Sequence, residues 1–408
     1  MKIAFFSDCY LDLTGGIVTN INIEKAELER RGHTVYVFSS SYPRTPKELK
    51  KLASQHIYPV PSCKVFGRGL TPIARRPGVI EKWLLKTHPE IKDFDIFYVH
   101  YEAGCSIAGL RLAKKLGIPS IQVMHGREDV GEANLIPFGL RTFVATMLNW
   151  FHSWYLPHPI KVKRDNYLAN TIAKAKMWTL MVNHANAASL IITPSNHFRQ
   201  KLIHYGVKRK IIALHHGLDA QTLSKKLAPK TLEPSGTLEI IWHSRVSGEK
   251  RILPFLQALA QVNGKYHLAV YGAGSDLKKA RRYAKRHRLN VTFYGNVNLE
   301  TIRKELLKAH LDVLVSYNFD TFGMTLIEAE AFGVPVFIAD PDLAEALLPG
   351  EYILSPDPYP AQMAKALEDV LAHPNIINKI SQKMLANRGQ NDVTIKIDNL
   401  EKIMKTLL

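Results

Sequence analysis

The sequence contains few cysteines and no long apolar run. Its three cysteines are Cys9, Cys63 and Cys105, an odd number whose spacing matches no zinc-ligand pattern. This excludes a disulfide framework and fits a reducing compartment such as the cytoplasm. No uncharged apolar run approaches the ~20 residues that a membrane-spanning helix needs. We therefore expect any contact with a membrane to be made at its surface.

Two further patterns are missing. The amino-terminal residues MKIAFFSDCY lack the apolar segment and cleavage site of a signal peptide, and predict a buried strand instead. The pair Gly15-Gly16 follows this strand, but the dinucleotide fingerprint G-x-G-x-x-G is absent. The second strand ends in residues 39–41, which are all serine, and not in an acidic ribose ligand. Both absences argue against an NAD-dependent enzyme, and we expect no cofactor.

The charge is strongly one-sided. Lys and Arg number 54 against 36 Asp and Glu, which gives a net charge of +18. Such a field attracts nucleic acid, an anionic membrane or a phosphorylated substrate. The chain shows no helix-turn-helix, RNP-type sheet or zinc pattern, so we expect no nucleic-acid partner. The hydrophobic fraction of 46% is ordinary for a globular protein.

Short apolar runs rich in β-branched residues alternate with longer amphipathic stretches, which is typical of parallel sheets covered by helices. The predicted strands are residues 2–7, 34–39, 95–100, 120–125, 190–195 and 210–216 in the first half, and 238–245, 267–272, 291–295, 311–317 and 335–340 in the second. Residues 225–236 contain two prolines and a glycine without apolar periodicity, and predict a linker.

This pattern predicts an α/β protein of two Rossmann-like domains that face each other across a cleft, because ligands bind at the carboxyl ends of such strands. We expect the first domain at residues 1–225 and the second at residues 237–385. Residues 386–408 are expected to form a helix that packs back on the first domain.

One segment departs from this alternation. Between Ala133 and Ile160, Arg141 is the single formally charged residue. Apolar side chains recur there at steps of three and four, which predicts an amphipathic helix. The apolar positions are Leu140, Phe143, Val144, Met147, Trp150, Phe151 and Trp154. Such a face packs on its own domain, on a second subunit, or among lipid headgroups, where Trp and Tyr are common.

Glycines and cations follow several predicted strands. Gly15-Gly16 opens a helix whose first N–H groups favour a phosphate, although a plain turn explains the pair equally well. Arg245 and Lys250 lie five residues apart on one loop, where they can hold a pyrophosphate and neutralise a leaving diphosphate. Another glycine turn, Gly272-Ala273-Gly274, follows the next strand.

The segment 318–336 leads from a strand end into a helix. It contains Phe322, Gly323, Met324 and Thr325, and a helix that starts at Gly323 aims N–H groups at phosphate or sugar oxygens. Glu328 lies further along this helix and can accept hydrogen bonds from a pair of ribose hydroxyls. Without these neighbours it would be read as a solvated helix carboxylate.

In these motifs the chain resembles the retaining glycosyltransferases of family four, which have the GT-B fold. The glycine pair, the G-R-x(4)-K loop with Ser244 in place of its glycine, the G-x-G turn and E-x(7)-E occur in the family's order. The resemblance implies that Arg245 and Lys250 bind the donor diphosphate and that Glu328 holds the ribose. The first carboxylate of E-x(7)-E, near the donor sugar, is Asp320 here.

The resemblance also assigns roles to the two domains and to further residues. It implies that residues 1–225 form the acceptor-binding domain and residues 237–385 the nucleotide-sugar-binding domain. A histidine at the end of an amino-terminal-domain strand faces the sugar in this family, which implies the same for His125. Tyr294, Gly295 and Asn296 occupy the position of the nucleobase pocket. Family four needs no metal, so the D-x-D-like Asp340-Pro341-Asp342 is not expected to bind one.

The expected reaction transfers a hexose from a nucleotide diphosphate sugar to a hydroxyl with retention of configuration. UDP and glucose are the family-level expectation for the donor. Residues 125–129, His-Gly-Arg-Glu-Asp, resemble a short motif of bacterial diacylglycerol glucosyltransferases, which implies a lipid acceptor such as diacylglycerol. Polysaccharide, teichoic-polymer and protein acceptors stay open, as does the oligomeric state.

Basic residues among apolar ones suggest a peripheral enzyme on the cytoplasmic face of an anionic membrane. Residues 64–86 hold the cations Arg68, Arg75, Arg76, Lys82 and Lys86 among the apolar Leu70, Ile73, Val79, Ile80, Trp83, Leu84 and Leu85. Lys161, Lys163 and Arg164 follow the aromatic helix. A second basic run from Lys278 to Arg288 predicts a solvated helix face.

Overall fold

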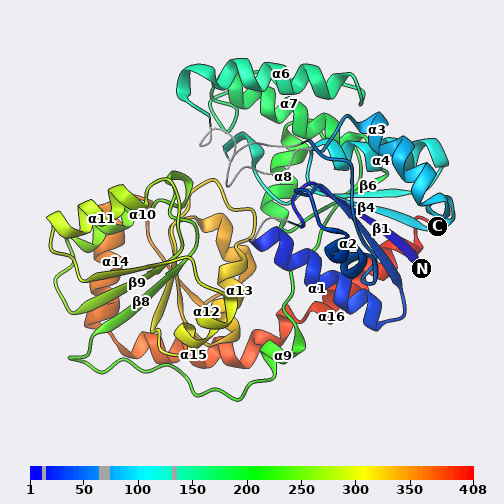
Figure 1. The fold of residues 1–408 in the computed structure, drawn as a ribbon. Coiled ribbons are helices and arrows are strands. Elements are labelled where there is room, and N and C mark those ends of the chain that lie inside the picture. Colours follow the sequence, from blue (N-terminus) through cyan, green and yellow to red (C-terminus); the bar gives the residue numbers. More distant parts are fainter. Residues whose placement is uncertain (12–14, 64–73, 131–135) are drawn as a thin grey trace. The chain divides into compact units, whose positions relative to one another are not determined.

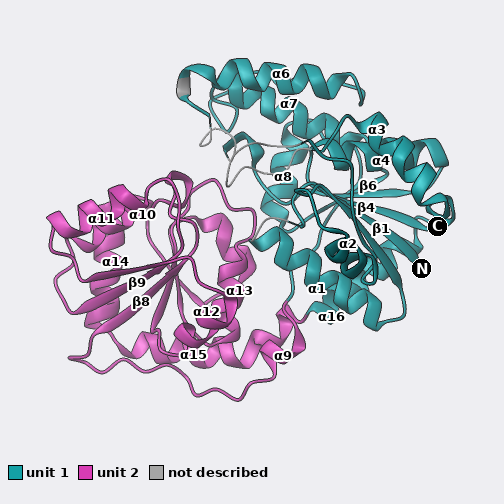
Figure 2. Cartoon of the chain, in the orientation of Figure 1, with its two compact units in different colours: residues 1–217, 393–408 teal, residues 218–392 magenta. Residues whose placement is uncertain are grey.

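The computed structural model describes residues 1–11, 15–63, 74–130 and 136–408. It consists of two compact units (Figure 2): unit 1 is Met1–Gly217 with Val393–Leu408, and unit 2 is Leu218–Asp392. The sequence predicts domain changes at residues 225 and 386, and the structure has them after Gly217 and Asp392. Arg68, Leu70, Ile73 and Ala133 of the predicted segments lie outside the described residues.

Unit 1 is built on a parallel sheet of seven strands. They are β1 (Lys2–Ser7), β2 (Thr34–Ser39), β3 (Ile57–Pro59), β4 (Ile96–His100), β5 (Ser120–Val123), β6 (Leu190–Thr193) and β7 (Ile211–Ala213), in the order β3-β2-β1-β4-β5-β6-β7. The central strand β1 pairs Ile3 with Val35 of β2 and with Ile96 of β4. Its apolar side chains are fully buried, as expected for a parallel strand covered on both faces.

Helices cover this sheet (Figure 1). They are α1 (Gly16–Arg30), α2 (Pro46–Ala53), α3 (Pro77–Thr87), α4 (Gly104–Leu116), α6 (Arg141–Ser153), α7 (Ile172–Asn186), α8 (Asn196–His204) and α16 (Val393–Lys405). The carboxyl-terminal helix α16 lies beside α1, and Ile397, Leu400 and Met404 join the core of unit 1. The buried Lys396 forms an ion pair with Glu24 of α1.

Unit 2 contains a second parallel sheet with the order β10-β9-β8-β11-β12-β13. Its strands are β8 (Leu238–His243), β9 (Tyr266–Tyr271), β10 (Val291–Gly295), β11 (Leu311–Leu314), β12 (Val336–Ile338) and β13 (Tyr352–Leu354). Its helices are α9 (Ala220–Leu223), α10 (Ile252–Leu259), α11 (Leu277–Arg286), α12 (Leu299–Leu306), α13 (Met324–Ala331), α14 (Pro360–Ala372) and α15 (Asn375–Asn387). In each sheet the strand order reverses beside the first strand, which confirms the predicted α/β fold of two Rossmann-like domains.

Helix α6 exposes the face that carries its large apolar side chains. Along α6 and its flanks, Leu140, Phe143, Met147, Trp150 and Trp154 are 50–63% exposed. The opposite face, with Ala145 and His152, is buried where α6 lies along α7 (Figure 1). Val144 and Phe151 of the predicted apolar face are half-buried. Among the described residues of unit 1, none covers the larger exposed side chains of this face, so a second subunit or lipid stays open as its partner. Within the described residues, no helix has both the length and the apolarity needed to cross a bilayer.

Helix α4 can lie close to the sheet because it contains Gly109. A Cβ at this position would lie 2.7 Å from Cγ of Phe6, a fully buried side chain of β1. Such a contact is too short, and neither the helix nor the ring can move without disturbing the core. Gly78 of α3 offers a comparison, because a Cβ there would meet nothing within 4 Å.

We predict that Gly109→Ala lowers the free energy of unfolding by about 1–3 kcal/mol, since it overpacks the core. The control Gly78→Ala places the same substitution in an open helical position, where it is expected to be neutral or to stabilise by up to ~1 kcal/mol. Urea unfolding of both variants measures the difference. Equal stability of the two variants would contradict this explanation of Gly109.

Candidate active site

The loop after β8 carries the two cations predicted to bind a diphosphate. Lys250 Nζ lies 2.8 Å from both carboxylate oxygens of Asp320, and both side chains are largely buried. The ring centroid of Phe319 lies 5.5 Å from the same Nζ. Arg245 is 63% exposed, and its guanidinium lies 3.3 Å from Glu249. Lys250 is thus held in place, whereas Arg245 extends into solvent, where an anion can reach it.

The glycine turn after β9 packs directly on this loop. A Cβ on Gly272 would lie 2.2 Å from the carbonyl oxygen of Ser244, and one on Gly274 would lie 2.3 Å from that of Val246. The two glycines are therefore required for the close approach of two backbones, whatever the ligand. A side chain at either position would displace the loop that carries Arg245.

Helix α13 begins at the predicted phosphate- or sugar-binding turn. Its N-cap Gly323 has a φ of 83°, a conformation that favours glycine, and is followed by Met324 and Thr325. The first N–H groups of any helix lack partners within it, so they can bind an oxyanion here. The buried Thr325 Oγ1 has no hydrogen-bond partner among the described residues. Phe322 is buried and anchors the turn in the core of unit 2.

Glu328 is the fifth residue of helix α13, just over one turn from its start, and lies beside a residue that was not predicted from the sequence. Nδ1 of His243, the last residue of β8, lies 3.6 Å from Glu328 Oε2. Nε2 of the same ring lies 3.3 Å from Oδ2 of Asp312 on β11. Burial raises the pKa of Glu328 above its ordinary value, although the neighbouring His243 opposes this shift. The signal available in the sequence was a histidine at a strand end, two residues before Arg245.

The predicted nucleobase residues form an exposed aromatic platform. The ring of Tyr294 is 52% exposed and stacks on Tyr271, with centroids 4.7 Å apart and planes 6° apart. Gly295 ends strand β10 with a φ of 76°, and Asn296 follows it at the surface. A flat, open ring of this kind can stack a base. The structure therefore gathers all the predicted residues of unit 2 at the carboxyl ends of its strands.

In unit 1, Gly15 and Gly16 form the start of helix α1. Gly15 has a φ of 143°, which favours glycine, and a Cβ there would meet nothing within 4 Å.

His125 is the predicted histidine at a strand end of unit 1. It follows β5, and its Nε2 lies 2.9 Å from Nδ1 of His100. The His216 ring is stacked on it at a centroid distance of 6.0 Å. Burial, together with His100, holds the pKa of His125 well below its ordinary value. This imidazole is therefore neutral near pH 7.

A second chain of histidines joins α6 to strand β5. Gln122 Nε2 donates to two backbone carbonyls, so its Oε1 must accept from His184 Nε2, 3.1 Å away. Because neutral His184 then accepts at Nδ1, it takes a hydrogen bond from His152 Nε2 at 3.0 Å. His152 Nδ1 is in turn hydrogen-bonded to His158. Burial lowers the pKa of His152 and His158, and that of His184 to about 3.

The D-x-D-like segment has a structural explanation. Asp340 Oδ2 accepts from the backbone N–H of Asn318 at 2.6 Å, and its Oδ1 accepts from that of Asp342 at 3.1 Å. Asp340 therefore fixes the backbone around it. Among the described residues, no three His, Cys, Asp or Glu side chains are grouped as metal ligands.

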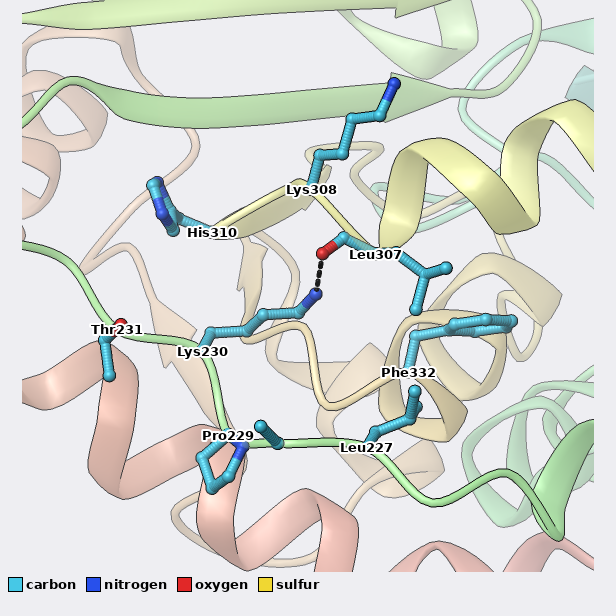
Figure 3. Close-up of a pocket in the computed structure, with 9 residues that line it drawn as sticks. Leu227, Pro229, Lys230, Thr231, Leu307, Lys308, His310 and Phe332 are labelled. Atoms are coloured by element: carbon cyan, nitrogen blue, oxygen red, sulfur yellow. Dashed lines mark hydrogen bonds between the residues drawn. The ribbon is translucent and has the colours of Figure 1, made fainter.

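A pocket of 340 Å³ in unit 2 lies apart from these residues (Figure 3). Leu307 and His310 line it just before β11, at the amino end of that strand. Lys230 Nζ donates to the carbonyl oxygens of Leu306 and Leu307, at 2.9 and 2.6 Å. Burial lowers the pKa of Lys230 to about 8. We interpret this lysine as a cap on the carboxyl end of α12.

Two buried histidines of unit 1, His100 and His184, predict loss of stability in acid. Burial lowers the pKa of each to about 3, below the unfolded value near 6.5, so the unfolded chain binds more protons and the free energy of unfolding falls as the pH drops below that value. Each of the two is expected to lower the free energy of unfolding by about 2 kcal/mol at about pH 5. Urea unfolding across this range should become less pH-dependent in His184→Gln, and unchanged in the control His373→Gln, an exposed histidine. A pH-independent unfolding free energy in the original chain would contradict the assignment.

Family models match both halves of the chain. Residues 14–222 match the model of Glycosyltransferase Family 4. Residues 224–392 match the model of Glycosyl transferases group 1. The boundary between the two matches lies close to the boundary between the two units.

Curated relatives are similar over the whole chain or over part of it. The chain is 23% identical to the alpha-monoglucosyldiacylglycerol synthase of Streptococcus pneumoniae, across 100% of this chain and 92% of that protein. It is 30% identical to the synthase of the same name from Acholeplasma laidlawii, across 31% of this chain and 30% of that protein. It is 29% identical to the lipopolysaccharide 1,6-galactosyltransferase of Escherichia coli, across 36% of this chain and 41% of that protein.

Solved structures share the fold. Anabaena HepE in complex with UDP has a TM-score of 0.68 at 16% identity, covering 100% of both chains. A mutant of Staphylococcus aureus TarM has a TM-score of 0.69 at 13% identity, covering 99% of both. These likenesses agree with the two Rossmann-like units, and the family matches confirm the resemblance that the motifs suggest. The chain belongs to glycosyltransferase family 4 and has the GT-B fold.

Proposed function

We propose that this glycosyltransferase moves glucose from UDP-glucose to the hydroxyl of a membrane lipid such as diacylglycerol, with retention of configuration. The observation that carries the proposal is the grouping of Arg245, Lys250, Glu328 and the start of α13 at the carboxyl edge of the unit 2 sheet. Diacylglycerol as acceptor is supported by the full-length similarity to an alpha-monoglucosyldiacylglycerol synthase.

In the proposed reaction, the bond between the anomeric carbon and the diphosphate oxygen breaks, and its electron pair leaves with UDP. Arg245, Lys250 and the N–H groups after Gly323 stabilise this growing negative charge. The acceptor oxygen forms the new bond to the anomeric carbon, and its proton passes to the departing phosphate. Glu328 holds the ribose, Tyr294 stacks the base, and the turn at Gly15 and Gly16 supplies further amides.

We favour attack on the same face of the sugar over a covalent intermediate, because Asp320 is poorly suited to act as a nucleophile. Both oxygens of this carboxylate lie 2.8 Å from Lys250 Nζ, and a carboxylate paired in this way is a weak nucleophile. We assign Asp320 to positioning Lys250 and to the sugar hydroxyls. We assign His125 to orienting the sugar, because a neutral imidazole can donate a hydrogen bond without acting as an acid.

Two surfaces of unit 1 support docking on an anionic membrane. The apolar face of α6 exposes Trp150 and Trp154, the residue type that is enriched where bilayer meets water. Arg75, Arg76, Lys82 and Lys86 are exposed along α3 and its start. Glu81, the acid of that helix, is buried in an ion pair with Arg111, so the exposed charge of α3 is positive.

Loss of the diphosphate clamp is expected to reduce turnover. Arg245→Ala and Lys250→Ala should each lower UDP release from UDP-glucose by about 100-fold at saturating donor, because each removes charge stabilisation of the leaving group. Lys279→Ala is a matched control, since Lys279 is 67% exposed and lies 3.4 Å from Asp276 in the same unit. Near-normal turnover of Arg245→Ala would contradict the clamp.

Membrane binding is expected to depend on the basic helix α3. Charge reversal of Arg75, Arg76 and Lys82 to Glu should weaken sedimentation with anionic vesicles by about 100-fold or more, since each cation contributes ~1 kcal/mol near an anionic leaflet. Reversal of the exposed Lys278, Arg282 and Lys285 of α11 changes the net charge equally and is expected to leave binding intact. Equal release by both triple variants would show that net charge alone is responsible.

A further inference from the structure

His243 joins three elements at the carboxyl edge of the unit 2 sheet. It ends β8, which pairs with β11 so that Ile241 lies opposite Asp312. The imidazole lies between two carboxylates, 3.3 Å from Asp312 and 3.6 Å from Glu328. The side chains of His243 and Asp312 are 3% and 0% exposed, whereas that of Glu328 is 18% exposed. Glu328 is thus the member of the group that a ligand can reach.

The charges of this group favour an imidazolium at His243. Two carboxylates so close to one another in a buried place repel unless a cation lies between them. Burial lowers the pKa of His243, but Asp312 and Glu328 outweigh it and raise that pKa above its ordinary value. Asp312 also acts to raise the pKa of Glu328, whereas His243 acts to lower it. The imidazolium therefore favours the charged form of Glu328 and opposes the effect of burial.

The other cations nearby already have carboxylate partners. Lys250 faces His243 from the loop and acts to lower its pKa, but Lys250 Nζ lies 2.8 Å from both oxygens of Asp320. Arg303 of α12 acts to lower the pKa of Glu328, while its guanidinium lies 3.2 Å from Asp219. Neither can take the place of His243 without leaving its own carboxylate.

The distance between His243 and Glu328 leaves hydrogen-bonding capacity on the carboxylate. At 3.6 Å the contact is an ion pair and too long for a good hydrogen bond, so both Glu328 oxygens can still accept from hydroxyls. Ser244 follows His243 in the chain, and Thr325 lies three residues before Glu328 in α13; the hydroxyl oxygens of both are buried and have no hydrogen-bond partner within the described residues. The contact of His243 Nε2 with Asp312 is likewise an ion pair without a hydrogen bond. Buried polar atoms without protein partners are unusual in a core and are typical of a binding site.

We propose that His243 is a positioning residue for donor binding, and that its imidazolium, held by Asp312, keeps the Glu328 carboxylate charged and oriented toward the ribose hydroxyls. This inference rests on the proposed role of Glu328 in holding the ribose. His243 does not touch the donor itself. Its effect is therefore confined to the part of the ligand that Glu328 binds.

Calorimetry with UDP, 2′-deoxy-UDP and pyrophosphate separates binding of the ribose from binding of the diphosphate. His243→Gln is expected to weaken UDP binding by about 10-fold, because it removes the cation that orients Glu328. It should also abolish the preference for UDP over 2′-deoxy-UDP, as Glu328→Ala should, while pyrophosphate binds unchanged. The matched control is His267→Gln, since His267 lies 2.8 Å from Glu239 at the amino end of the same sheet. It is expected to bind all three ligands normally.

The pH profile gives a readout that a purely structural role would not move. UDP affinity of the original chain should fall as the pH rises above the ordinary histidine pKa near 6.5 and the imidazolium loses its proton, and the affinity of His243→Gln should stay low and flat. Normal ribose preference in His243→Gln, alongside its loss in Glu328→Ala, would overturn the inference. Equal weakening of pyrophosphate in His243→Gln would also overturn it. No binding of UDP to the original chain would instead refute the proposed function.

Discussion

The carboxylates at the carboxyl edge of the unit 2 sheet depend on cations placed beside them. Asp320 has Lys250 at 2.8 Å, and Asp312 and Glu328 have His243 between them. Buried carboxylates without such partners would take up protons or turn toward solvent. The same pairs that make this edge stable also fix the positions of Lys250 and Glu328, so stability and preorganisation have one origin here.

Backbone packing keeps this arrangement in place. The loop after β8 lies against the turn at Gly272 and Gly274 so closely that no side chain fits between them. Cations fixed by such packing need little rearrangement when charge develops on a leaving group, which is how preorganised sites lower a barrier. In unit 1 burial lowers the pKa of His125 and of His184, so these imidazoles are neutral and act through hydrogen bonds, whereas the groups in unit 2 act through charge.

Sequence reasoning predicted the elements and the linear motifs well, because both are local. Apolar β-branched runs predict parallel strands, and Arg245, Lys250 and Glu328 stand at fixed offsets after them. The pairing of His243 with Asp312 and Glu328 was missed, since it depends on β8 lying next to β11, which the order along the chain does not reveal. The α6 periodicity predicted a helix, but not which face would be buried, because Ala145 and His152 pack on α7 through small and polar contacts.

Transfer of label from radiolabelled UDP-glucose tests most directly whether this chain glucosylates a membrane lipid. The protein is incubated with anionic vesicles that contain diacylglycerol, and the label is followed into the lipid and aqueous phases. The proposed function predicts labelled lipid with the α configuration, and about 100-fold less of it with Arg245→Ala. Unlabelled lipid, together with full transfer to a polysaccharide, teichoic-polymer or protein acceptor, would contradict it.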